Sequence, residues 1–142
     1  MIVVDTNLLV FAYDLQAPRH AEARRWWEAT LSGVEPVGVP WVVVLAFTRL
    51  LTHPTICDRP VTAAAVREIV ATWLAQPQVR LLSPGDRTME TFFTLLDAAG
   101  VGGNLATDAL IAAHAIEQAG VVHSDDRDFG RFAGLRWRNP LD

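Results

Sequence analysis

Lysine is absent from this chain of 142 residues, and cysteine occurs only once, at position 57. A single cysteine excludes an internal disulfide and favours a reducing compartment, so we expect a cytoplasmic protein in which Cys57 is inert packing. The apolar run at the N-terminus follows no basic segment and is interrupted at Asp5, which predicts neither a signal peptide nor a membrane span. No GKT or GKS run occurs, which excludes the common nucleotide-cradling loop.

The charge of the chain is low and slightly acidic. A formal net charge of −4 does not favour a general nucleic-acid binder. All basic residues are arginines, whose guanidinium suits bidentate contacts with phosphate, although a GC-rich genome explains the same bias equally well. Arginines gather in the first long helix and near the C-terminus. Four of them are candidates for binding a phosphate backbone, with an ordinary solvated surface as the alternative for each: Arg24, Arg25, Arg127 and Arg131.

Strand patterns alternate with helix patterns along the whole chain. Strands are predicted at residues 2–4, 37–39, 79–82 and 121–123, with an edge strand at 135–137. Helices are predicted at residues 7–13, 18–31, 41–51, 63–75, from 87 onward and 105–118. This order predicts an α/β fold with a mostly parallel sheet and helices on both faces. The length favours one domain over residues 1–142.

Two helices carry more specific expectations. The helix over residues 41–51 is apolar all round, so we expect it to be buried, in part by another subunit. Asp86 is expected to cap the following helix. Four residues of that helix are expected on its core side: Met89, Phe92, Phe93 and Leu96.

Acidic residues follow two of the predicted strands and open one helix. Asp5 ends the first strand, Asp126 and Asp128 follow the strand at 121–123, and Asp108 lies in the first turn of the helix after a glycine-rich loop. Each acid alone is also explained as a helix cap, a partner of the helix dipole or a solvated turn residue. Because parallel strands end at one edge of a sheet, we expect all four carboxylates to converge there.

Converging carboxylates repel one another unless a cation offsets their charge. Oxygen ligands of this kind suit Mg²⁺ or Mn²⁺. Such ions polarise phosphodiesters and lower the pKa of water. The acidic residues therefore suggest metal-dependent phosphodiester hydrolysis.

Three motifs of the chain resemble those of PIN-domain ribonucleases, and most closely those of VapC toxins from toxin–antitoxin pairs. The motifs are Asp5-Thr6-Asn7-Leu8-Leu9, Thr107-Asp108-Ala109 and Ser124-Asp125-Asp126-Arg127-Asp128-Phe129. The resemblance covers essentially the whole chain in order and spacing. It implies a three-layer α/β/α sandwich and a Mg²⁺- or Mn²⁺-dependent endoribonuclease that cuts tRNA, rRNA or mRNA. It also implies a homodimer and inhibition by a VapB-like antitoxin.

The resemblance also implies roles for individual residues. Asp5, Asp108 and Asp126 match metal ligands, and Asp128 matches a further acid of the catalytic set. Four polar residues match positions that orient acids or water: Thr6, Asn7, Asn104 and Ser124.

One position departs from the family pattern. The family carries a Glu on the helix after the second strand, whereas no acid occurs between Pro36 and Cys57, and the matching position is near Ala46. Three alternatives remain open at this stage. In the first, three acids and water hold one metal ion. In the second, Asp128 or another residue compensates for the missing Glu. In the third, activity is weakened.

Two other functions compete with the ribonuclease hypothesis. The missing Glu supports a non-catalytic RNA- or protein-binding module that keeps the fold. A phosphatase with Asp5 as covalent nucleophile is disfavoured, because Asn7 stands where its second acid is needed and the chain has no Lys. For an antitoxin, Trp26, Trp27 and Trp41 are candidate contacts, with packing in the core as the stronger alternative for each. No short motif encodes which RNA is cut.

Overall fold

The computed structural model describes residues 1–55, 59–100 and 102–142. Cys57 lies outside the described residues, so its expected packing role stays a prediction. The elements in chain order are β1 (Ile2–Val4), α1 (Thr6–Tyr13), α2 (His20–Ser32), β2 (Val37–Pro40), α3 (Trp41–Thr52), α4 (Ala63–Leu74), β3 (Val79–Leu82), α5 (Thr88–Ala99), the 3₁₀ turn η1 (Gly103–Leu105), α6 (Ala106–Glu117), β4 (Val121–His123), the 3₁₀ turn η2 (Arg127–Arg131) and β5 (Trp137–Arg138). Over the described part of the chain, the helices are too short or too polar for a membrane span.

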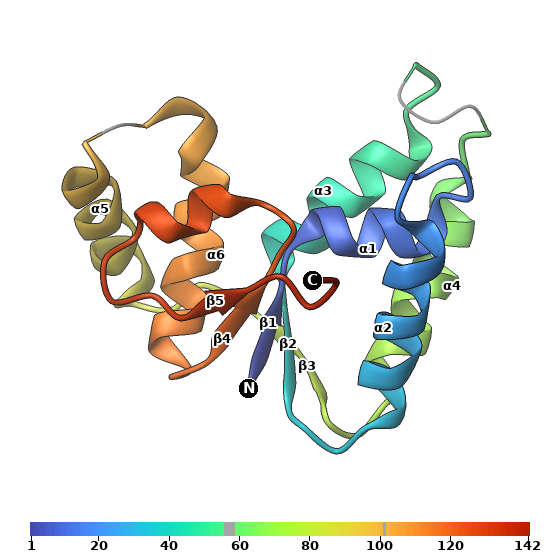
Figure 1. The fold of residues 1–142 in the computed structure, drawn as a ribbon, viewed down its shortest axis with the longest axis horizontal. Coiled ribbons are helices and arrows are strands. Elements are labelled where there is room, and N and C mark those ends of the chain that lie inside the picture. The colour runs from blue at the N-terminus through green and yellow to red at the C-terminus, as the bar shows by residue number, and fades with distance from the viewer. Residues whose placement is uncertain (56–58, 101) are drawn as a thin grey trace.

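The strands form one parallel sheet in the order β3-β2-β1-β4-β5. In Figure 1, α5 and α6 lie to the left of this sheet, and α1, α2 and α4 lie to its right. The fold is therefore a three-layer α/β/α sandwich, as predicted. The predicted edge strand is confirmed as β5, which begins at Trp137 rather than Leu135.

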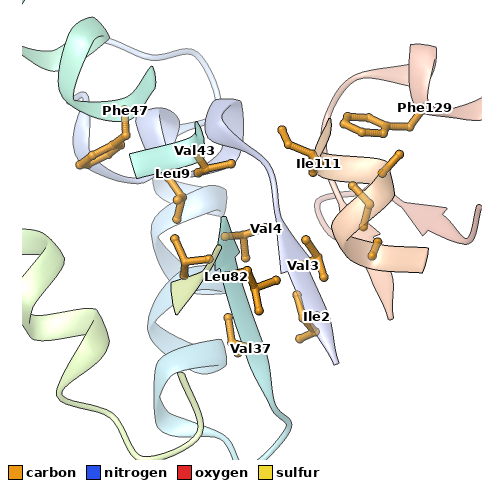
Figure 2. Packing of buried hydrophobic residues seen from close by; sticks show 14 of the residues in the cluster. Ile2, Val3, Val4, Leu9, Val37, Val43, Phe47, Leu82, Ile111 and Phe129 are labelled. Carbon is orange, nitrogen blue, oxygen red and sulfur yellow. The ribbon is translucent and has the colours of Figure 1, made fainter. Parts of the chain in front are cut away.

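The central strand β1 is buried on both faces, and none of its three residues is more than 6% exposed. Val3 points toward the layer that contains Ile111, whereas Val4 points toward Leu9 and Leu82 (Figure 2). Both faces are apolar because side chains alternate along a strand and helices cover each side. A carboxylate is therefore tolerated only where β1 leaves the sheet, at Asp5.

Helix α3 forms despite its β-branched run, because Val43, Phe47 and Leu51 recur at helical spacing and are buried. Within the described part of this chain α3 is buried on one side only, so the predicted burial of its remaining surface by another subunit stays a prediction. Trp41 is 52% exposed and Leu45 is 66% exposed, since they lie on the side away from the core.

The start of α5 also differs from the prediction. Arg87 is the N-cap residue, no capping bond comes from a side chain, and Asp86 is not the cap. Thr88 organises the turn instead, since its Oγ1 accepts from the Gly85 backbone N–H at 2.8 Å and donates to Glu117 at 3.1 Å. This start turns Met89 and Phe93 outward, with 69% and 55% exposure, so their predicted core positions are wrong, while Phe92 and Leu96 pack on the core as expected.

Candidate active site

Asp5 lies where β1 passes into α1. Its backbone N–H donates to the carbonyl of His123 at 3.1 Å, which extends the β1–β4 pairing by one residue. Its Oδ1 accepts from the Thr6 backbone N–H at 2.7 Å, so Asp5 caps α1. The side chain is only 6% exposed. The sheet thus fixes Asp5 beside the first residue after β4.

That residue, Ser124, is fully buried and connects the two acidic motifs. Its hydroxyl donates to Oδ2 of Asp5 at 2.6 Å and accepts from the Asp126 backbone N–H at 2.9 Å. Asn7 lies beside it, with its Nδ2 3.4 Å from Ser124 Oγ and its Oδ1 3.4 Å from the Asp125 backbone N. Ser124 therefore ties the end of β1 to the turn that carries Asp126.

Burial dominates the electrostatics of Asp5. Loss of solvent raises the pKa of the Asp5 carboxyl above 3.8, the hydrogen bonds from Ser124 and Thr6 lower it, and the charge of Asp126 raises it. Because Asp5 is buried and faces another acid, negative charge at this position is unfavourable even with two hydrogen-bond donors. A cation at this edge would offset that charge.

Asp108 shows the convergence of the acids most clearly. It lies in the first turn of α6 and is partly buried. Desolvation and, to a smaller extent, the charges of Asp5, Asp126 and Asp128 together raise its pKa to about 7. Asp108 therefore lies within electrostatic range of three acids that come from two distant parts of the sequence, as the sequence pattern predicted.

Asp126 and Asp128 shape the turn after β4. Oδ1 of Asp126 accepts from the Asp128 backbone N–H at 2.8 Å, which makes Asp126 the N-cap of η2. Asp128 is half exposed and lies 3.5 Å from the Arg131 guanidinium. Asp126 thus faces the other acids from a fixed turn, while Asp128 is a more peripheral member.

The donor set suits a hard divalent cation, because it consists of carboxylate oxygens that repel one another. Each oxygen of Asp5 keeps a second lone pair beside its hydrogen bond. In the described residues, no donor contacts the Asp108 carboxylate, which leaves both of its oxygens available. No three His, Cys, Asp or Glu side chains in this same part of the chain are grouped closely enough to hold an ion, so the exact ligand set stays a prediction.

Helix α3 opens directly after β2, at the same edge of the sheet as the acids. The family Glu would come from this helix. Its sequence WVVVLAFTRLLT contains no acid, so the four carboxylates lack that contribution.

The remaining predicted site residues differ in whether they lie with the acids. Thr6 is buried beside Asp5, but its Oγ1 has no hydrogen-bond partner in the part of the chain that the structure describes. Arg127 and Arg131 lie on η2 with the acids, whereas Arg24 and Arg25 lie on α2, where Arg24 pairs with Glu28 at 2.9 Å. For Asn104, on η1, no hydrogen bond to the acids is found in the described residues.

Three residues beside the four acids were not predicted as site residues from the sequence: Asp125, and Arg19 and Asn139, which both donate to it. Arg19 and Asp125 stand 106 positions apart in the chain. No local pattern signals this contact, because it depends on where the C-terminal segment crosses the start of α2.

Comparison with known proteins supports one family. The PIN domain family model matches residues 2–135. Ribonuclease VapC33 from Mycobacterium tuberculosis is 38% identical over 141 residues, which span 99% of each chain.

Solved structures share the fold. Mycobacterium tuberculosis VapC20, described as a sarcin-ricin loop cleaving toxin, superposes with a TM-score of 0.71 at 21% identity, covering 96% of this chain and 99% of that one. VapBC2 from Rickettsia felis, bound to a DNA fragment from its promoter, gives a TM-score of 0.68 at 17% identity, with 98% of each chain covered. The chain therefore belongs to the PIN domain family, in its VapC branch.

Proposed function

We propose that residues 1–142 form a single metal-dependent endoribonuclease domain that acts as the toxin of a toxin–antitoxin pair. The observation that carries this proposal is that Asp5, Asp126 and Asp128 at this sheet edge each act through their charge on Asp108, whose pKa is raised to about 7. The name of VapC33, a ribonuclease that matches along its whole length, supports the same activity.

Asp5, Asp108 and Asp126 would hold a Mg²⁺ or Mn²⁺ ion. When bound, the ion supplies Lewis-acid polarisation of a phosphodiester. Ser124 keeps Asp5 and Asp126 in a fixed relation, and its hydrogen bond favours the ionised form of Asp5 against the effect of burial. Asp128 stands beside them as a further acid. Asn7 donates to the Ser124 hydroxyl and accepts from the Asp125 backbone N–H.

RNA would pass the acids with its phosphates against the arginines of η2. Arg127 is exposed, and Arg131 is drawn toward the acids by its ion pair with Asp128. Both belong to the same turn as Asp126 and Asp128, so they are better placed than Arg24 and Arg25 on α2. Arginine at such a rim offsets the net negative charge of the chain locally.

The test is cleavage of RNA by purified protein in Mg²⁺ or Mn²⁺. We expect Asp5→Asn and Asp108→Asn to lose more than about 100-fold in rate, on the scale of removing a key charged group from an active site. Both variants should fold, because Asn at position 5 keeps an oxygen that accepts the Thr6 N–H, and each change removes a poorly solvated charge. Cleavage at the wild-type rate by either variant would refute the metal-site assignment.

A catalytically weakened binding module is the second candidate, and the absence of an acid on α3 favours it. Calorimetric titration with Mn²⁺ separates the two functions. We expect millimolar or tighter binding to the wild type and none to Asp108→Asn. Failure of the wild type to bind Mg²⁺ or Mn²⁺ at millimolar concentration would favour the binding module.

A VapB-like antitoxin and a second copy of the chain are the proposed protein partners. The Rickettsia felis structure with the same fold is a VapBC complex, which supports an antitoxin for this chain too. A hollow of about 320 Å³ between α1 and α2 is lined by apolar residues such as Leu15 and Leu31 and by charged ones such as Arg24 and Glu28, and would accept an amphipathic segment. Trp27 is only 2% exposed, so it is excluded as a free contact, while Trp26 is partly buried and Trp41 stays available.

The exposed apolar residues of α3 and α5 support the homodimer. Trp41 and Leu45 lie on α3, and Met89 and Phe93 lie on α5. Apolar side chains exposed to this extent are stabilised when a second surface covers them.

A further inference from the structure

Asp125 stands between Ser124 and Asp126, yet it belongs to a different set of contacts from the four acids. Its Oδ1 accepts from Nδ2 of Asn139 at 2.6 Å and from Nη1 of Arg19 at 3.2 Å. Both donors come from outside the acidic turn, since Asn139 follows β5 and Arg19 precedes α2. Asp125 is therefore directed toward the C-terminal segment.

Arg19 joins that segment to the start of α2. Its Nη2 donates to the Leu141 carbonyl at 2.7 Å and to Glu22 at 2.9 Å, and its Nη1 lies 3.2 Å from Asp142. Asn139 fixes the same segment from within, because its Oδ1 accepts from the Leu141 backbone N–H at 3.0 Å. One guanidinium thus holds residues 139–142 against Asp125.

Asp125 is linked in turn to the acids. Its backbone N–H lies 3.4 Å from Oδ1 of Asn7, and Asn7 contacts Ser124, which donates to Asp5. The neighbouring Asp126 N–H donates to the same Ser124 hydroxyl. The backbone N–H of Ser124 donates to the Arg138 carbonyl at 3.1 Å, one residue before Asn139. Two consecutive residues of the acidic turn, Ser124 and Asp125, thus contact the end of the chain, at Arg138 and Asn139.

The contact between Asp125 and Arg19 also affects the charge at the acidic edge. Four acids already repel one another at this edge, and an unpaired Asp125 would add a fifth negative charge beside Asp126. The ion pair with Arg19 offsets that charge, and it is only partly exposed, with 31% and 29% of the two side chains accessible. Partly buried pairs are screened less by solvent than surface pairs.

We propose that Arg19 and Asn139 are positioning residues, which hold Asp125 and thereby keep Ser124 and Asp126 in register with Asp5. The C-terminal segment over residues 139–142 is then part of the active site. This inference rests on the proposed nuclease function, and its test includes a measurement that does not depend on activity.

The test compares Arg19→Gln, Asn139→Ala and Asp125→Ala with the control Arg67→Gln, an exposed arginine on α4. Outer groups that orient metal-binding carboxylates are worth about 10- to 100-fold in activity or metal affinity. We therefore expect each of the three variants to lower kcat and Mn²⁺ affinity by about tenfold, with KM for RNA changed less than about twofold. Asp125→Asn, which keeps the accepting oxygen, should restore most of the rate.

The double variant Arg19→Gln with Asp125→Ala should lose clearly less than the product of the two single losses, because both changes break the shared Arg19–Asp125 contact. Independent, multiplied losses would contradict the proposal. So would wild-type kcat and wild-type Mn²⁺ affinity in both Asn139→Ala and Asp125→Ala. Thermal unfolding curves establish that each variant is folded, and Asn139→Ala carries the test if Arg19→Gln does not fold.

Hydrogen exchange at the backbone amides of Asp126 and Asp128 separates this proposal from the nuclease function itself. We expect faster exchange at both amides in Arg19→Gln and Asn139→Ala, and unchanged exchange in Arg67→Gln. If the wild type cuts no RNA but exchange rises, the proposed function fails while the contact network stands. If exchange is unchanged, the positioning role is refuted whatever the activity.

Discussion

Single residues in this chain have environments that their types alone do not reveal. Asp5 and Asp108 are both aspartates at the start of helices, which ordinarily indicates capping and a favourable dipole. In the structure, Asp5 is a cap, but it also accepts from Ser124 and faces Asp126. Asp108 receives no hydrogen bond in the described residues and is surrounded by like charge. The same residue type is thus held by hydrogen bonds at one position, whereas at the other it lacks such bonds among the described residues and has a pKa raised to about 7.

The raised pKa of Asp108 predicts a pH dependence for the metal-free protein. With a pKa of about 7 in the fold against 3.8 for the ordinary group, the folded chain holds a proton that the unfolded chain releases. The contribution of Asp108 to the free energy of unfolding should therefore fall as pH rises from about 4 to about 7, and then level off. Because Asp108 is partly solvated, we expect this loss to be about 1–2 kcal/mol, less than the full shift would give.

Asp108→Asn should remove that dependence. In EDTA at pH 8, we expect the variant to be more stable than the wild type by about 1–2 kcal/mol in urea unfolding, with the difference shrinking at pH 5. Asp97→Asn, at an exposed position on α5, is the matched control. An equal stability difference at both pH values would mean that Asp108 is not held protonated by its neighbours.

At the scale of elements, the patterns in the sequence predicted the sheet and the helices well. The apolar runs at β1, β2 and β4, the buried ends of β3 and the helical spacing in α4 are local signals, so each element is found close to its predicted range. The errors at α5 arise because an apolar pattern shows that a face can be buried, but not whether this chain alone covers it, so Met89 and Phe93 were misplaced. For the same reason the pattern of α3 did not show which of its side chains this chain leaves exposed, and these are Trp41 and Leu45.

The turn between α6 and β4 lies at the amino-terminal edge of the sheet, opposite the acids, and offers a test of how β1 and β4 are packed together. A Cβ on Gly120 would lie 2.7 Å from the Met1 carbonyl oxygen, and the next residue, Val121, donates its N–H to that same oxygen at 2.9 Å. The Met1 backbone carbonyl cannot move aside as the end of a flexible side chain can. We therefore expect Gly120→Ala to lower the free energy of unfolding by about 1–3 kcal/mol.

Gly85→Ala is the matched control, because nothing lies within 4 Å of a Cβ at that position. Its stability should stay within about 0.5 kcal/mol of the wild type. Urea unfolding of both variants measures the difference. Equal midpoints for the two variants would contradict the close approach of Gly120 to Met1.

At the scale of the whole molecule, the fold brings together what the sequence spreads out. Asp5, Asp108 and Asp126 could be nominated from sequence because strand ends in a parallel sheet share one edge. The network through Arg19, Asp125 and Asn139 could not, because contacts across more than 100 positions depend on the final path of the chain. The net charge of −4 likewise gives no sign of where basic residues gather, such as the two arginines of η2 beside the acidic turn.

Cleavage of RNA at these four acids can be tested inside cells by mapping new 5′ ends in total RNA after brief induction of the protein. We expect discrete new ends with the wild type and none with Asp5→Asn at equal protein level. The same ends in purified RNA should require Mg²⁺ or Mn²⁺ and vanish in EDTA. Identical ends from the wild type and Asp5→Asn, or ends that persist in EDTA, would show that the acids are not the site of cleavage.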